Sequence, residues 1–399
     1  MNRHGIALMT SAHVVDDVYQ GAVPALLPFL VAQRHYSYTA VAGLTLAATV
    51  LSSVAQPAFG WWADRRPRRW LIPAGILTAA TGVGLAGFTP DYLSTWLVIA
   101  LAGLGIAAFH PEAARAARQA AGDNNRAMSV FAVGGNGGVA LGSLVATPVL
   151  LITGLHGTAL LVAPAIVMCV VIVTRLESVL DGPRARRESA ASGGSGARGE
   201  AGADDWPAFF RLAGVVITRA VLFAGVTSFI ALYFIHQLKT STGVGNSALT
   251  TFLVAGACGT LLGGWIADRT QRLTAVRFGF AVTAPTMIGL VLAPNVPVAF
   301  AFTALAGIGT FIPFGVFVML GQDYLPNRIG TASGLTVGLA VSVGGLFTPP
   351  LGWLADHTSL RLMLATLIVL PAVALGISMF MHDPRSTNER RPQPAAVTR

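Results

Sequence analysis

The sequence predicts an all-α polytopic membrane protein, with 12 transmembrane helices in two pseudo-symmetric six-helix bundles. The first observation is composition: 54% of the 399 residues are hydrophobic and 11% are charged, against about 25% charged in a typical soluble domain. The second is that apolar runs of about 20 residues, enough to cross about 30 Å of hydrocarbon, recur about a dozen times. The third is that motifs of the first half return in the second at one fixed offset.

The spans are expected at 5–33, 40–63, 70–89, 94–118, 128–153, 156–175, 210–237, 246–267, 273–292, 296–321, 330–355 and 361–381. Among 26 basic residues, the predicted outer loops hold only Arg34, Lys239 and Arg361. This positive-inside asymmetry predicts an even number of spans and two cytoplasmic termini. The net charge of +9 is therefore explained by topology and does not indicate nucleic-acid binding.

Two motifs establish the repeat. Ala304–Gly309 repeats Ala100–Gly105 at an offset of 204 residues (304 − 100). At the same offset, Gly60, Asp64, Arg65 and Arg68 return as Gly264, Asp268, Arg269 and Arg272. Two motifs at one offset indicate internal duplication. The expected organisation is a bundle at 1–175, a flexible cytoplasmic linker at 176–209, a second bundle at 210–382 and a disordered cytoplasmic tail at 383–399.

The first span carries ionisable residues where hydrocarbon is expected. His13, Asp17 and Gln20 follow one another at helical steps and share a face, and Asp16 flanks that face by about 100°. Intramembrane ionisable residues mark substrate or proton routes. Two adjacent acids in a low dielectric do not both ionise cheaply, so at least one is expected to hold a proton. We assign Asp16 and Asp17 to proton coupling and His13 and Gln20 to substrate binding; the alternative is a structural pair of His13 with Asp17.

The fourth span has a similar interruption. Glu112 and Arg115 lie three residues apart, so they can pair on one helix face. Pro111 predicts a kink that could turn His110 towards that face. We assign Glu112 to proton coupling and His110 and Arg115 to substrate binding. A purely structural salt bridge at the inner end of a long helix is the alternative.

Two further polar residues lie in other spans. Asn136 interrupts a run of glycines that allow close packing or helix distortion. It either lines the substrate cavity or bonds a neighbouring helix. Arg219, at the offset of 204 from Val15, requires an anionic partner inside the membrane. That partner is either an anionic substrate, which makes Arg219 a substrate-binding residue, or one of the acids Asp16, Asp17 and Glu112.

The repeated loop GWWADRRPRR, which matches G-x3-D-R-x2-R-[RK], resembles that of the major facilitator superfamily. The segments DD…ALLPFL, FHPEAAR and FAVGGNGGVALG are similar to the fosmidomycin-resistance branch, whose members are inner-membrane efflux proteins. The resemblance implies that the loop gates the transporter at Gly60, Asp64, Arg65 and Arg68 and at their repeats; glycine there lets helices approach closely. One departure weakens an antiport assignment: Gly142 precedes Ser143 rather than a proline.

The predicted function is a secondary active transporter that works by proton-coupled efflux of small, anionic, fosmidomycin-like compounds and confers drug resistance. Its partners are the substrate, protons and the lipid bilayer; it is expected to act as a monomer, without cofactor, and not as an enzyme. ATP-driven transport is disfavoured because Lys239, the single lysine, lacks the glycines of a phosphate-binding loop.

Three alternatives remain open. One is a proton-coupled symporter that imports a small organic anion, and another is a non-transporting receptor. The third is an intramembrane metal enzyme using His13, Asp16, Asp17, His110 and Glu112. Because the chain lacks a compact metal motif such as HExxH, no metal site is predicted.

Overall fold

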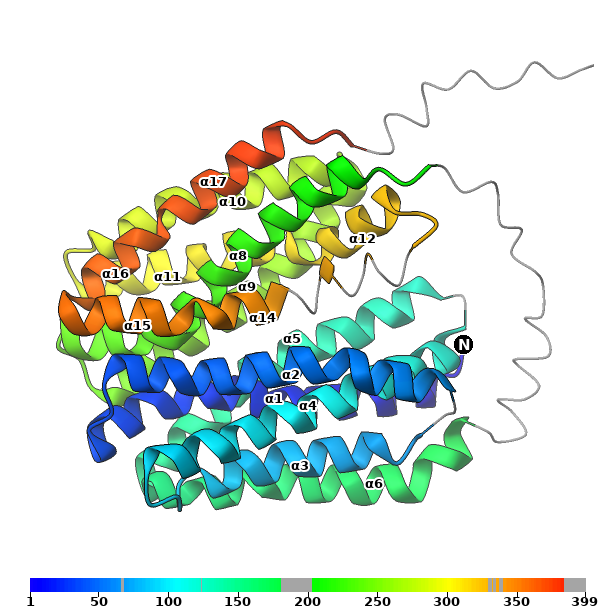
Figure 1. Cartoon of the computed structure of the whole chain (residues 1–399), viewed down its shortest axis with the longest axis horizontal. Helices are drawn as coiled ribbons and strands as arrows, with labels where there is room; N and C mark the ends of the chain where they lie inside the picture. The colour runs from blue at the N-terminus through cyan, green and yellow to red at the C-terminus, as the bar shows by residue number, and fades with distance from the viewer. Residues whose placement is uncertain are drawn as a thin grey trace, which may run out of the picture.

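The computed structural model describes residues 1–65, 68–122, 124–180, 203–328, 332, 335–336 and 340–383. In this part of the chain every regular element is helical. Ten of the described helical segments are long and apolar enough to cross a membrane, and α3 is a shorter apolar helix. With the interrupted span formed by α14 and α15, they give the expected twelve-span, two-bundle architecture (Figure 1).

The first bundle contains α1 (Arg3–Arg34), α2 (Tyr38–Arg65), α3 (Leu71–Leu85), α4 (Tyr92–Ala121), α5 (Asn125–Thr153), the 3-10 helix η1 (Leu155–Val162) and α6 (Ala163–Leu180). The second contains α8 (Trp206–Leu232), the π-helical turn η2 (Tyr233–Gln237), α9 (Thr242–Arg269), α10 (Arg272–Val291), α11 (Val296–Phe311), α12 (Phe314–Tyr324), α14 (Ala340–Leu346), α15 (Thr348–His357), α16 (Leu360–Leu367) and α17 (Val369–Met379). The predicted linker and tail lie largely outside the described residues, so the bundle boundaries stay predictions.

Several predicted spans are interrupted by prolines, which lack the N–H that continues a helix. One break lies between α14, which ends at Leu346, and α15, which begins at Thr348 and has Pro349 and Pro350 in its first turn. Two other breaks were not expected: Pro313 separates α11 from α12, and Pro371 follows the break between α16 and α17. The sixth span also differs from expectation, because it begins as the 3-10 helix η1. By contrast, α4 continues through Pro111.

Glycines bring α1 and α5 into backbone contact. A Cβ on Gly21 would lie 1.9 Å from Val139 O, one on Gly138 would lie 2.4 Å from Val14 O, and one on Gly142 would lie 2.2 Å from Val18 O. None of these distances is possible for a real side chain. The glycines of the fifth span therefore serve close packing of α5 on α1.

Tyr19 connects α1 to the sixth span by hydrogen bonds. Its hydroxyl donates to Leu161 O at 2.9 Å and accepts from Ala165 N at 3.1 Å. The two bonds satisfy backbone groups where η1 passes into α6, in a place that water does not reach. Tyr19 is fully buried, so α1 lies at the centre of its bundle.

The bundles contact each other along two seams, α2 with α14 and α15, and α5 with α9. Four of the hydrogen bonds between them are Thr348 Oγ1 to Ala42 O (3.1 Å), Ser228 Oγ to Thr45 Oγ1 (3.1 Å), Asn246 Nδ2 to Ala25 O (3.0 Å) and Ser143 Oγ with Thr250 Oγ1 (3.0 Å). All four lie in the half of the molecule remote from the N-terminus. Figure 1 shows α15 running beside α2 there. We call this the closed end, and the end that carries Asn2, Ala121 and Tyr324 the terminal end.

The glycine contact predicts that Gly138→Ala destabilises the protein. Its added methyl group forces α1 and α5 apart, an overpacking that costs about 1–3 kcal/mol, so the midpoint of thermal unfolding in detergent should fall. The matched control is Gly137→Ala, because a Cβ on Gly137 meets nothing within 4 Å. Equal midpoints for the two variants would contradict the contact.

Candidate functional site

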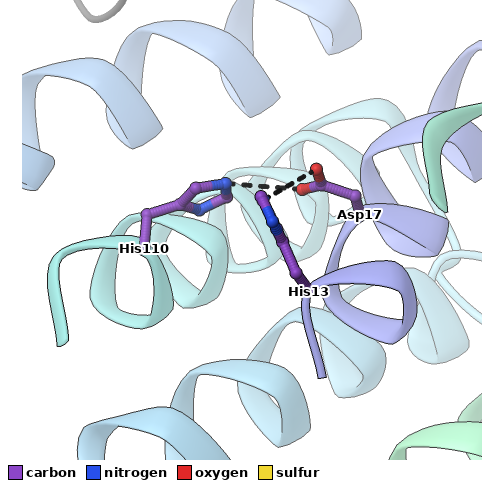
Figure 2. Close-up of side chains that lie close together, drawn as sticks. All are labelled: His13, Asp17 and His110. Atoms are coloured by element: carbon purple, nitrogen blue, oxygen red, sulfur yellow. Dashed lines mark ion pairs between the residues drawn. The ribbon is translucent and has the colours of Figure 1, made fainter. Parts of the chain in front are cut away.

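The structure brings His13, Asp17 and His110 together between α1 and α4 (Figure 2). His13 Nε2 lies 3.3 Å from Asp17 Oδ2, and His110 Nε2 lies 3.5 Å from Asp17 Oδ1. His13 and Asp17 are 8% and 5% exposed, and His110 is half-buried. The carboxylate of Asp17 therefore lies between two imidazole rings in a largely buried setting.

Backbone carbonyls determine which nitrogen of each ring carries the proton. His13 Nδ1 lies 2.8 Å from Phe131 O, and His110 Nδ1 lies 2.8 Å from Ile106 O. A carbonyl oxygen only accepts, so both Nδ1 atoms donate. In the neutral rings each Nε2 is then a lone-pair acceptor that faces an acceptor oxygen of Asp17. Such a contact is favourable only when a proton or another cation lies between the two atoms.

Asp16 adds a second carboxylate beside this cluster. It is 0% exposed, and neither of its oxygens has a hydrogen-bond partner among the described residues. His110 Nδ1 lies 3.7 Å from Asp16 Oδ2, within ion-pair range but beyond hydrogen-bond distance. An isolated buried carboxylate is costly unless it is neutralised. Asp16 therefore increases the demand for positive charge in the cluster.

Helix α5 closes the cluster from the third side without filling it. A Cβ on Gly135 would lie 2.6 Å from Asp17 Oδ2 and 2.6 Å from His13 Nε2. The ring of Phe131 stacks on that of His13, with centroids 4.3 Å apart. The glycine run thus provides the volume that the imidazole and the carboxylate occupy. Neither Gly135 nor Phe131 was predicted as part of the site, although the density of glycines was a usable signal.

Glu112 does not join the cluster. Its Oε2 lies 3.7 Å from Arg115 Nη1, and Glu112 is 2% exposed whereas the Arg115 side chain is 39% exposed. The sequence left open whether a kink would turn His110 towards this face. In the structure His110 contacts Asp16 and Asp17 of α1 instead. Of the predicted residues of the fourth span, His110 therefore belongs to the cluster with Asp17, whereas Glu112 and Arg115 form a separate pair.

Arg219 of α8 is buried in the second bundle, 8% exposed. Its Nε donates to Thr310 O at 2.8 Å. Three phenylalanine rings surround its guanidinium carbon, with centroids 4.7 Å (Phe314), 5.1 Å (Phe311) and 5.5 Å (Phe223) away. Within the described chain Arg219 forms no ion pair with Asp16, Asp17 or Glu112, so the alternative of an acid partner is not supported. No acidic side chain of the described residues pairs with its guanidinium.

The remaining predicted substrate-binding residues, Gln20 and Asn136, are half-buried. Neither forms a hydrogen bond with another residue that the structure describes. For Asn136, the alternative of a bond to a neighbouring helix is therefore not realised.

The predicted gating residues lie at the terminal ends of α2 and α9. Arg272 pairs with Asp323, Arg269 lies over Trp265 and Arg68 lies over Trp62. Asp268 is exposed, and the side chains of Asp64 and Arg65 lie outside the described part of the chain. The expectation that helices approach closely at Gly60 and Gly264 is wrong here. A Cβ added to Gly60 would lie 4.0 Å from Pro111 Cβ, and one added to Gly264 would meet nothing within 4 Å.

The glycine and the aspartate of the loop motif, in the pattern Gly-x3-Asp, recur as Gly352 and Asp356 at the closed end. Asp356 Oδ1 accepts from Tyr38 N at 2.8 Å, and its Oδ2 accepts from Thr39 N at 2.8 Å and Thr39 Oγ1 at 2.6 Å. A carboxylate of the second bundle thereby caps the N-terminus of α2 in the first bundle. Its negative charge also interacts favourably with the positive end of the helix dipole. Gly352 permits this approach, because a Cβ there would lie 2.6 Å from Tyr38 O.

Comparison with known proteins agrees with this architecture. The family model of the Major Facilitator Superfamily matches residues 9–349. The chain is a member of this superfamily. It is accordingly a multi-pass membrane protein of a transporter family.

Relatives of the superfamily match most of the chain. It is 31% identical over 388 residues to "Uncharacterized MFS-type transporter YfnC" of Bacillus subtilis (strain 168), covering 92% of this chain and 90% of that protein. It is 28% identical over 383 residues to "Fosmidomycin resistance protein" of Escherichia coli (strain K12), covering 95% and 93%. Among solved structures, a bacterial homologue of the human lysosomal transporter Spinster, inward-facing and occupied, superposes with a TM-score of 0.78 at 16% identity over 98% of both chains.

The capping contact predicts that Asp356→Asn weakens the closed end. An amide oxygen replaces a charged acceptor of three hydrogen bonds, and loss of such a cap costs about 0.5–2 kcal/mol. We expect spin labels on His35 and Thr358, in a background without Cys169 and Cys258, to show a larger population of long distances. Asp91→Asn is the matched control, since Asp91 caps α4 at the same end but within one bundle. Identical distance distributions for both variants would contradict the role of Asp356.

Proposed function

We propose that this transporter exports small anionic compounds and is driven by protons that enter in exchange. The observation that carries the proposal is Arg219, a buried guanidinium without an anionic partner among the described residues. A buried cation is costly unless it is paired. An anionic substrate would supply the missing partner, and a guanidinium can bind a phosphonate or carboxylate through two parallel hydrogen bonds.

The imidazole–carboxylate cluster supports proton coupling. His13 and His110 both present acceptor nitrogens to Asp17, so a proton between them is favourable. Asp16, beside the cluster, and Glu112, outside it, are the other buried carboxylates among the described residues of the first bundle. In this proposal the proton carriers belong to the first bundle and the anion-binding residue to the second. His13 and His110 thereby shift from the predicted substrate set to the proton site, while Gln20, Asn136 and Arg115 remain candidates for substrate contacts.

The direction of transport rests on similarity. The Escherichia coli relative is named for resistance to fosmidomycin, an anionic phosphonate, and resistance of this kind is consistent with export from the cell. Import of a small organic anion together with protons would use the same residues. Many antiporters of the superfamily have a proline at the position after Gly142, where this chain has Ser143, so import remains an alternative. The sign of the pH gradient that drives transport distinguishes export from import.

We further propose that the terminal end faces the cytoplasm of a cell with a bacterial-type inner membrane. Gly60 and Gly264 meet no close neighbour, whereas the hydrogen bonds between the bundles lie at the closed end. With the terminal end in the cytoplasm, this would be the arrangement of an inward-facing transporter. The loops at Asp64, Arg65 and Arg68 and at Asp268, Arg269 and Arg272 would then engage when the terminal end closes, and one chain would suffice for transport.

The proposal predicts a charge-dependent loss in Arg219→Lys. A single ammonium cannot reproduce two parallel bonds, and hydrogen bonds to charged groups contribute about 1.5–3 kcal/mol. Affinity for fosmidomycin, measured by isothermal titration on purified protein, should fall roughly 10- to 100-fold, while neutral compounds that the wild type binds should be unaffected. Arg277→Lys is the control, because Arg277 donates to the carbonyls of Ser378 and Met381. Equal losses for anionic and neutral compounds would exclude the substrate role.

Proton coupling predicts separate effects on driven and undriven transport. Asp17→Asn should abolish uptake of fosmidomycin into inside-out vesicles under an imposed pH gradient, because the carrier between the two imidazoles is lost. Exchange of labelled for unlabelled fosmidomycin without a gradient should persist. Asp16→Asn should act similarly, and Glu112→Gln more weakly because Glu112 faces Arg115.

The control for these variants is Asp204→Asn, which removes an acid that pairs with Arg328 near the start of α8. Its gradient-driven uptake should equal that of the wild type. Full gradient-driven uptake in all three test variants would rule out the proposed coupling set.

A further inference from the structure

The cluster in Figure 2 has the composition of a transition-metal site. One nitrogen of His13, one nitrogen of His110 and one carboxylate oxygen of Asp17 lie within 4.8 Å of one another. Two imidazoles and one carboxylate are ligands that suit zinc and the neighbouring first-row ions. The three residues come from two helices and are separated by up to 97 positions (110 − 13), which is why the chain shows no compact metal motif.

The distances around Asp17 are close to those that an ion requires. Ligand atoms about 2.0–2.2 Å from a tetrahedral zinc ion lie roughly 3.3–3.6 Å from one another. The two contacts of Asp17 with the imidazole Nε2 atoms measure 3.3 and 3.5 Å. These contacts are made by the two different oxygens of Asp17, so ligation through one oxygen requires the three ligand atoms, which all lie within 4.8 Å of one another, to move closer together. His110 is the less buried of the two histidines.

The second coordination shell is already present. Metal-bound histidines almost always donate their other ring N–H to a carbonyl or a carboxylate, which determines the tautomer and the ring orientation. Both histidines do so here, His13 to Phe131 O and His110 to Ile106 O, each at 2.8 Å. This leaves both Nε2 lone pairs directed at the region occupied by Asp17, as ligation requires.

Charge and space in the cluster also favour a cation. Asp17 Oδ1 and both oxygens of Asp16 are buried without a hydrogen-bond partner among the described residues. Two carboxylates balance the charge of a divalent ion. Arg219, the buried cation of the second bundle, forms no ion pair with either of them. On the side of α5, Gly135 contributes no side chain, so the ligands are not crowded from that direction.

We propose that His13, Asp17 and His110 bind one divalent first-row transition-metal ion, with zinc as the representative. Asp16 balances its charge, and a fourth coordination position remains for water or an anionic ligand. The ion joins α1 to α4 within the first bundle. The ion would occupy the same His13, Asp17 and His110 as the proton in the coupling proposed above, so metal and proton compete for these ligands.

The test uses full-length protein purified without a polyhistidine tag, treated with a chelator and then dialysed against zinc chloride. Metal analysis should find about one zinc per chain. His13→Gln, Asp17→Asn and His110→Gln should each weaken zinc binding by more than the roughly 10- to 100-fold that changes in a second shell cause. His357→Gln is the matched control: the His357 ring contacts Trp353 O one turn earlier at 2.9 Å, as that of His110 contacts Ile106 O, but His357 is exposed. This variant should retain full binding.

X-ray absorption by the zinc-loaded wild type gives a result that needs no variant. It should show nitrogen and oxygen ligands at about 2.0–2.2 Å, with the scattering pattern of two imidazoles. Absence of stoichiometric zinc, a sulfur ligand from Cys169 or Cys258, or equal loss of binding in His357→Gln would overturn the proposal. Because no step measures transport, failure of this test leaves the efflux proposal standing, and failure of the transport tests leaves this one standing.

Discussion

The close contact between α1 and α5 is the constraint on which the site depends. Gly21, Gly138 and Gly142 allow the two backbones to touch, and Gly135 leaves the space in which His13 and Asp17 lie. In a membrane, apolar side chains gain little by leaving lipid for protein, so helices associate through tight packing and hydrogen bonds. The buried Asp16, Asp17 and His13 and the half-buried His110 depend on this packing to keep lipid away from them.

The duplication allows the ionisable residues of the two bundles to be compared position by position. Arg219 occupies the position in the second bundle that Val15, next to Asp16, occupies in the first, and Phe314 occupies that of His110. The pairing is retained: His110 contacts Asp16 and Asp17, and Phe314 contacts Arg219. One helix pair, used twice, has thus become an acid–imidazole cluster in one bundle and a guanidinium among aromatic rings in the other.

The Gly-x3-Asp pattern at Gly352 and Asp356, which the loop motif shares, places a carboxylate at the opposite end of the molecule. The span that ends in Asp356 runs in the opposite direction from those that end in Asp64 and Asp268, so its carboxylate reaches the closed end. There it caps α2 across the boundary between the bundles. A helix N-terminus presents unpaired N–H groups and partial positive charge, so a carboxylate from another bundle holds the two together without a buried ion pair.

The sequence by itself determined the number and location of the spans, the duplication and the identity of the ionisable residues within them. These follow from hydropathy, from helical periodicity and from the cost of placing charge in hydrocarbon, all of which are local properties of the chain. It also identified Gln20, Asn136 and the gating loops as candidates, but not their partners. Helical periodicity states which residues share a face and says nothing about which helix that face meets. Only the tertiary structure decided that His110 turns to Asp17 rather than Glu112, that Arg219 meets phenylalanines rather than an acid, and that Gly60 and Gly264 lie apart from their neighbours, because each depends on the rotation and separation of helices far apart in the chain.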